Sequence, residues 1–313
     1  MRIETLKISF FIESIIDRLL ASNSEAVEHK SLVCQILDLT IKAEQLQTVT
    51  MLPPNIRAKI DALKRIQIDL LNKEAEFHKR VYSMETDFQT TLLEMFDKRR
   101  QIVNGFYLPE HEDTLKAEDH EIATDEQVKG IPEFWLSVFK MAPILSSLIH
   151  PHDEDVLKHL MDVRSIMINE PKAGFVLEFE FGPNNNFTNK VLTKRYEMEC
   201  VPDEEKLASF NGFEIYDTAG CHIDWKVGGN LTVTVENGTE RAVDSFFNFF
   251  RPQKLVGNAD PLVYKQFMEY DFEIGYFIKE RVVPRAVLFY SGDFVNVEED
   301  SLAYVLDEQG QQL

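Results

Sequence analysis

Few residues in this chain have the types and spacing that catalysis needs. The stretch "HPHDED" (150–155) places two imidazoles beside three carboxylates, which are possible zinc ligands. A zinc site also needs ligands at helical spacing or on a separate rigid element, and acids at a helix start are explained by the helix dipole alone. We therefore read the stretch as the start of a helix and expect no metal and no cofactor; a metal-dependent hydrolase is the alternative that it leaves open.

Two other stretches resemble parts of catalytic sites. "DTAG" (217–220) is similar to the magnesium-facing motif of a GTPase, but no G-x-x-x-x-G-K-[ST] phosphate loop occurs, so we read it as a turn between strands. Glu178 and Glu180 could form a glycosidase pair, but such carboxylates lie on separate elements around a cleft. We predict that the protein is not an enzyme.

The same two glutamates belong to the stretch "GFVLEFEFG" (174–182). Its apolar side chains alternate with Val176, Glu178 and Glu180, which predicts a half-buried strand with an acidic outer face. Carboxylates near each other on a sheet repel and do not help folding. The pattern therefore indicates a face that serves a partner.

The charge of the chain is unevenly distributed. Residues 1–105 contain 15 acids and 15 bases, so the whole formal charge of −20 lies in residues 106–313. This excess disfavours direct binding to nucleic acid or to an anionic membrane and favours a basic partner. No run of 18 apolar residues occurs, and the three cysteines are far apart, which fits a reducing compartment.

Residues 55–100 are predicted to form one helix, because two prolines precede it and no Gly or Pro interrupts it. Such a helix is about 70 Å long, whereas a compact body of the remaining residues is about 40–45 Å across. Its apolar stripe therefore needs a second chain, and we predict a homodimer; a helix that breaks and folds back is the alternative. The stripe comprises Ile56, Ile60, Leu63, Leu70, Phe77, Val81, Met84, Phe88 and Leu92.

The predicted fold class is α+β, with a long N-terminal dimerisation helix followed by an antiparallel β-sheet packed with helices. We divide the chain into a helical dimerisation region (1–105), an acidic linker (106–128), an acidic α+β domain (129–295) and a short tail (296–313). Within the domain we expect helices at 132–140 and 153–161, strands at 174–181, 191–200 and 222–227, a hairpin at 230–243 turning at Asn237-Gly238, a short aromatic helix at 244–250 and a closing helix pair kinked at Pro284.

Seven stretches together resemble the nucleosome assembly protein family over about residues 50–295. They are "KRRQIVNG" (98–105), "KGIPEFWLSVFK" (129–140), "DEDVLKHLMDV" (153–163), "GFVLEFEFGPNNNFTNKVLTKRYEM" (174–198), "GCHIDWK" (220–226), "DSFFNFFRP" (244–252) and "DFEIGYFIKERVVPRAVLFYSGD" (271–293). The resemblance implies a histone chaperone that dimerises through the long helix and holds core histones, preferentially the outer histone dimer, in an acidic cavity. It also implies assembly and disassembly of nucleosomes without ATP, and shuttling between nucleus and cytoplasm.

We expect the histone-binding surface to be built from acids at one helix start and on two strands. The alternative is a dimeric acidic scaffold for another basic protein. The expected residues are Asp153, Glu154, Asp155, Glu178, Glu180, Glu197, Glu199, Asp203, Glu204 and Glu205.

Overall fold

The computed structural model describes residues 51–107, 129–204, 207–236, 239–251 and 261–293. The chain divides into two compact units, residues 1–71 and 72–313. Several expectations lie outside the described residues: the helices before residue 51, nearly all of the acidic linker, the tail, Glu205 and the Asn237-Gly238 turn itself.

The long helix is confirmed as the single helix α3 (Pro54–Val103). It extends the predicted range by one residue at its start and three at its end, so the alternative of a broken helix is wrong. Arg100 lies in the last turn, where a cation interacts favourably with the helix dipole. Gly105 follows with φ of 70°, a conformation that suits glycine at a helix end.

Four antiparallel strands form the main sheet in the order of the sequence. They are β1 (Leu160–Ile168), β2 (Gly174–Phe181), β3 (Val191–Glu199) and β4 (Glu214–Gly220). Strand β2 confirms the predicted alternation, because Phe175, Leu177 and Phe179 are fully buried whereas Glu178 and Glu180 are half-buried.

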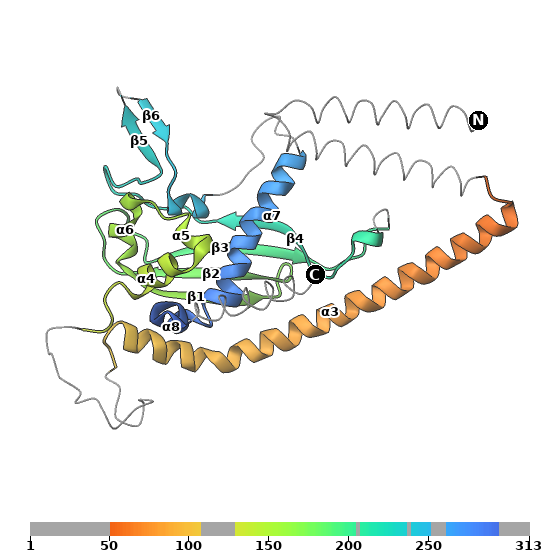
Figure 1. Ribbon diagram of the computed structural model, residues 1–313, viewed down its shortest axis with the longest axis horizontal. Coiled ribbons are helices and arrows are strands. Elements are labelled where there is room, and N and C mark those ends of the chain that lie inside the picture. The colour runs from red at the N-terminus through yellow and green to blue at the C-terminus, as the bar shows by residue number, and fades with distance from the viewer. Residues whose placement is uncertain (1–50, 108–128, 205–206, 237–238, 252–260, 294–313) are drawn as a thin grey trace, which may run out of the picture. The chain divides into compact units, whose positions relative to one another are not determined.

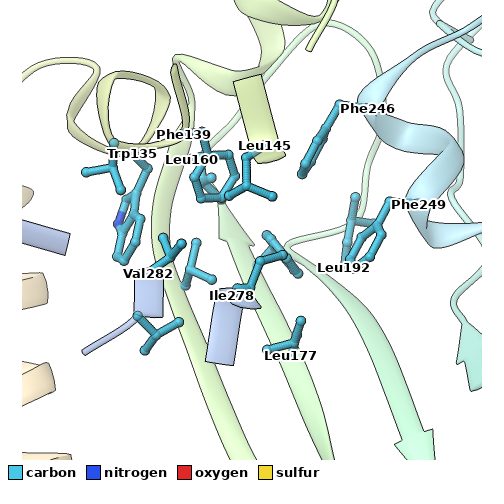
Figure 2. Packing of buried hydrophobic residues seen from close by; sticks show 14 of the residues in the cluster. Trp135, Phe139, Leu145, Leu160, Leu177, Leu192, Phe246, Phe249, Ile278 and Val282 are labelled. Atoms are coloured by element: carbon cyan, nitrogen blue, oxygen red, sulfur yellow. The ribbon is translucent and has the colours of Figure 1, made fainter. Parts of the chain in front are cut away.

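Helices cover the apolar face of this sheet (Figure 1). They are α4 (Phe134–Met141), α5 (Pro143–Ser146), α6 (Pro151–Leu157), the 3-10 helix η3 (Phe246–Phe250), α7 (Pro261–Phe277), the π-helix η4 (Ile278–Val282) and α8 (Ala286–Ser291). Figure 2 shows their side chains meeting those of the strands in one core, with Trp135, Phe139, Leu177, Leu192, Phe246, Phe249, Ile278 and Val282 among them. A short 3-10 turn, η2 (Leu207–Ser209), lies between β3 and β4.

Three local predictions are wrong, and each has a physical reason. Residues 222–227 form no strand: only Trp225 pairs, through one bridge with Phe187, and the chain then turns with Gly229 N–H donating to the carbonyl of Lys226. The "DTAG" stretch is the end of β4 and not a turn, since Thr218 pairs with Tyr196 in the ladder. The second helix ends at Leu157, and β1 follows where helix was expected.

The predicted hairpin is confirmed as β5 (Val233–Glu236) paired with β6 (Thr239–Ala242). The aromatic stretch 246–250 is helical, as expected, and four of its five residues are buried phenylalanines. Pro284 lies between η4 and α8, where the closing helices were expected to kink.

The two edge strands of the main sheet, β1 and β4, differ in how their outer sides are modified. At β1, Gln89 of α3 donates to the carbonyl of Ser165 (2.7 Å) and accepts from Met167 N–H (2.8 Å), so a side chain completes part of this edge. At β4, the ladder shifts register so that Tyr216 is an extra residue between two pairs. Such a bulge increases the local twist of an edge strand.

Candidate functional site

The outer face of the sheet, opposite to the helices, carries acids directly facing acids. Glu197 of β3 lies opposite Asp217 of β4, and Glu199 lies opposite Glu214. Their neighbours Tyr196 and Thr218 are buried on the helical side, which places these four carboxylates on the outer side. We call Glu197, Glu199, Glu214 and Asp217 the acidic corner.

The geometry of the acidic corner is unfavourable by itself. Directly opposed residues of antiparallel strands have Cβ atoms about 4.5–5.5 Å apart, and like charges at that distance are destabilising. Two basic side chains offset part of this repulsion: Arg195 contacts Glu197 (3.0 Å) and Lys172 contacts Glu199 (3.0 Å). Both pairs are partly exposed, so each is worth about 0.2–1 kcal/mol. A further cation from a partner would therefore be bound favourably here.

The β1–β2 half of the outer face differs from what the strand sequence alone predicted. Glu180 is held by Arg100 of α3 through two hydrogen bonds of 2.6 and 2.5 Å, and this bonding raises the pKa of the guanidinium. Glu178 lies opposite Arg164 in the register. Each of these two glutamates thus has a basic residue beside it, so this half carries little net charge.

Asp153 is a structural residue in this fold. It is fully buried, and its carboxylate accepts hydrogen bonds from Ser245 Oγ (2.6 Å), Phe246 N–H (2.8 Å) and His150 N–H (3.0 Å). These bonds fix the start of α6 against η3. Its oxygens are thus used within the domain and are not available at the surface.

The other expected acids are at the surface to different degrees. Glu154 pairs with Lys140 (2.9 Å), and Asp155 pairs with Lys158 (2.8 Å), whose hydrogen bond lowers the pKa of the Asp155 carboxyl. Asp203 and Glu204 are exposed beyond the end of β3. The structure therefore brings together only the two β3 glutamates of the expected set, and adds Glu214 and Asp217, which sequence analysis missed.

Much of the net charge belongs to segments of the sequence outside the four strands. Residues 108–128 hold eight acids and one lysine, and residues 294–313 hold five acids and no base. Their net charges of −7 and −5 make up 12 of the 20 excess negative charges. The acidic corner is thus a small part of the total charge, but one that is fixed on paired strands.

Much of the apolar stripe of α3 is exposed. In the part of the helix that belongs to residues 72–313, Phe77, Met84 and Phe88 are 60%, 70% and 62% exposed, whereas Ala75 and Tyr82 on the other side are buried. Ile56, Leu63 and Leu70 are exposed as well, and the remaining three residues of the predicted stripe are half-buried.

The "HPHDED" stretch contains no assembled metal site. The rings of His150 and His152 stack 5.7 Å apart, and the carboxylate of Asp153 is occupied as described above. Among the described residues, no three His, Cys, Asp or Glu side chains are grouped to hold a metal ion. Within that same part of the chain, no helix combines the length and apolar character that crossing a bilayer requires.

Comparisons with known proteins agree with this architecture. The family model for nucleosome assembly protein (NAP) matches residues 58–293. Nucleosome assembly protein 1-like 1-A of Xenopus laevis is 38% identical over 288 residues, covering 80% of this chain and 73% of the relative. Nucleosome assembly protein 1-like 4 of Mus musculus is 38% identical over 293 residues, covering 80% of this chain and 77% of the relative.

Among solved structures, nucleosome assembly protein 1 from Plasmodium knowlesi superposes with a TM-score of 0.53 at 27% identity. That superposition covers 77% of this chain and 98% of the other. The predicted fold class and the resemblance noted in the sequence are thereby confirmed, and the chain belongs to the nucleosome assembly protein family.

Proposed function

We propose that this protein is a histone chaperone that binds core histones through the acidic corner. The observation that carries the proposal is the cross-strand register of that corner, in which Glu197 faces Asp217 and Glu199 faces Glu214. The fold holds these carboxylates together against their repulsion, so a basic partner relieves a cost that the free protein already bears. Asp203 and Glu204 are exposed just beyond the end of β3, and we propose that they contribute to the same binding.

The mechanism that follows is one of competition. Histones are strongly basic and bind DNA non-specifically by releasing counterions from it. A chaperone that covers their basic surface lowers the concentration of free histone, so only well-ordered contacts with DNA remain favourable. No phosphate-binding loop occurs in the sequence, and we propose that assembly and disassembly proceed without ATP, with the outer histone dimer as the preferred cargo, in both nucleus and cytoplasm.

We test the site by reversing its charge. The variant Glu197→Lys, Glu199→Lys, Glu214→Lys and Asp217→Lys should bind the purified outer histone dimer at least about tenfold more weakly at physiological salt, with a shallower salt dependence. A matched control reverses Asp224, Glu240, Asp244 and Asp293, which are exposed acids outside the corner, and changes the net charge equally. Titration by fluorescence anisotropy, with circular dichroism to confirm folding, measures both.

The outcomes separate the candidate functions. Equal loss in both variants would mean that total charge, and not the corner, determines binding. Unchanged affinity of a folded corner variant would refute the site. If the parent binds a linker histone or a ribosomal protein more tightly than core histones at the same salt, the dimeric scaffold for another basic protein becomes the better description.

We propose further that the chain is a homodimer through the exposed stripe of α3. Burying a Phe, Leu or Met side chain contributes about 1.5–3 kcal/mol, and Phe77, Met84 and Phe88 are 60%, 70% and 62% exposed. Light scattering should give a dimer mass at low micromolar concentration. The variant Phe77→Asp with Phe88→Asp should be monomeric or aggregated, and a monomeric parent would contradict the proposal.

A further inference from the structure

Two apolar hollows adjoin Arg251 at the end of η3. One has a volume of about 250 Å³ and is lined by Trp225, Phe247 and Phe250, among others. The other has a volume of about 300 Å³ and is lined by the aromatic rings of η3 and α7, including those of Phe249 and Phe267. Arg251 lines both, so one cation lies between two apolar depressions.

The guanidinium of Arg251 is exposed, and it makes no hydrogen bond or ion pair with the described residues. The neighbouring Asn248 lines the second hollow and donates from Nδ2 to the carbonyl of Val243 (2.9 Å), which fixes its side chain at this position. The rim therefore offers a cation that has no side-chain partner among the described residues.

The carboxylate of Asp271 lines the second hollow, but both of its oxygens are already bonded within the domain. Its Oδ1 contacts the buried ammonium of Lys194 (2.8 Å) and its Oδ2 accepts from Thr218 Oγ1 (3.0 Å). Its charge is balanced inside the domain, so Arg251 carries the one uncompensated charge among the described residues that line this hollow. A basic segment would be repelled here, whereas the acidic corner attracts one.

We propose that the two hollows and Arg251 form a docking site for an extended segment of another protein in which acidic residues lie between large apolar side chains. The carboxylate would pair with the Arg251 guanidinium, and the apolar side chains would fill the hollows. Charge complementarity selects this class of ligand over a basic or purely apolar one.

The site lies among η3 and α7 on the helical side of the sheet, whereas the acidic corner is on the outer face. A basic cargo and an acidic partner could therefore be bound at the same time. This inference is independent of what the acidic corner binds.

Binding is measured through the fluorescence of Trp225, because this residue lines one hollow. The chain's other tryptophan, Trp135, is 1% exposed, so its fluorescence should not respond. The full chain is titrated with three nonapeptides, acetylated and amidated: GLFEEDLFG, GLFKKKLFG and GSSEEDSSG. We expect saturable change of Trp225 fluorescence with the first peptide, and at least about tenfold weaker binding of the other two.

The charge-reversed chain, Arg251→Glu, should bind GLFEEDLFG at least about tenfold more weakly and should now prefer GLFKKKLFG. Lys190→Glu is the matched control, since Lys190 is exposed elsewhere and the charge change is equal. The Arg251 side chain makes no hydrogen bond or ion pair with the described residues, so its variant should keep the near-ultraviolet circular dichroism of the parent.

Failure of GLFEEDLFG to bind, or binding that Arg251→Glu leaves unchanged, would overturn the proposal. The variant Glu298→Lys, Glu299→Lys and Asp300→Lys tests whether the acidic C-terminal segment of the chain itself occupies the site. If it binds GLFEEDLFG much more tightly than the parent does, the chain's own C-terminal segment fills the site, and the proposed external partner is wrong.

Discussion

Two charged clusters are buried in the same domain, but their polar atoms are hydrogen-bonded to different degrees. Lys194 is fully buried and donates to Asp271 Oδ1 (2.8 Å) and to the carbonyl of Phe249 (2.9 Å). At the seam between α3 and β1, Arg99 Nη2 lies 3.9 Å from Asp162 Oδ1, and neither atom has a hydrogen-bond partner among the described residues.

The difference shows two ways of holding an element against the sheet. Directed bonds hold α7, since Asp271 joins it to both β3 and β4, and the Tyr196 hydroxyl also donates to the Asp271 carbonyl (2.9 Å). Around Arg99 of α3, contacts with aromatic rings accompany the directed bonds that Gln89 and Arg100 make along the same helix: the Arg99 guanidinium lies 5.0 Å from the Trp135 ring. Burial lowers the pKa of Arg99 to about 10, because its charge is only partly compensated by Asp162.

The largest effect should come from Lys194→Met. Removing the cation leaves the Asp271 carboxylate buried without compensation, which should lower the free energy of unfolding by about 3–5 kcal/mol. Urea unfolding at one fixed protein concentration measures it. Lys158→Met is the matched control: its ion pair with Asp155 is exposed, so the expected loss of stability is much smaller. Similar losses in the two variants would erase the distinction between buried and exposed pairs.

A smaller effect is expected for Arg99→Met. Asp162 keeps its hydrogen bond from Arg164 Nε (2.6 Å), and methionine retains apolar contact with the Trp135 ring. We expect a loss of about 1–3 kcal/mol, the cost of leaving the Val283 carbonyl and the Asp162 carboxylate less well satisfied. Unfolding under the same conditions compares the two sites directly. A loss as large as that of Lys194→Met would show that Arg99 stabilises the fold as strongly as Lys194 does.

The smallest effect concerns pH. Burial raises the pKa of Asp162 above its usual 3.8. The folded state therefore favours the protonated form, and this group's contribution to stability is lost as pH rises from 3.8 through the raised pKa. The variant Asp162→Asn lacks this titrating group. The unfolding free energy of the parent minus that of the variant should therefore fall as pH rises from 3.8 through the raised pKa, and then level off. A difference that rises with pH would reverse the assignment.

The parts of the fold that were predictable have a continuous local signal. Helix α3 was recognised because its stripe is long and uninterrupted by Gly or Pro, and the β5–β6 hairpin because Asn237-Gly238 favours a two-residue turn. Strand β1 was missed because Asp162 and Val163 are both buried, so the alternation that identifies a strand is broken. Asp162 is buried beside two cations, Arg99 and Arg164. Arg99 is distant in sequence, and the pairing with Arg164 is a contact that the periodicity of apolar residues does not reveal.

The candidate site was predictable only in part for a related reason. Strand sequence placed Glu197 and Glu199 on one face, but which strand would lie beside them depended on recognising β4. The alternation of Phe213 and Ile215 with Glu214 was the available signal. Asp153 could not be separated from its exposed neighbours, because its partners Ser245 and Phe246 are about 90 residues away.

The edges of the sheet have a consequence for solubility. An unpaired edge strand invites pairing with the edge of another molecule, the first step of aggregation. Here Gln89 occupies part of the β1 edge, while β4 combines the Tyr216 bulge with the like charges of Glu214 and Asp217. Two approaching β4 edges would meet a twisted backbone and repelling carboxylates. The carboxylates that we propose as a binding surface thus also oppose sheet extension, and a protein kept at high concentration benefits from both effects.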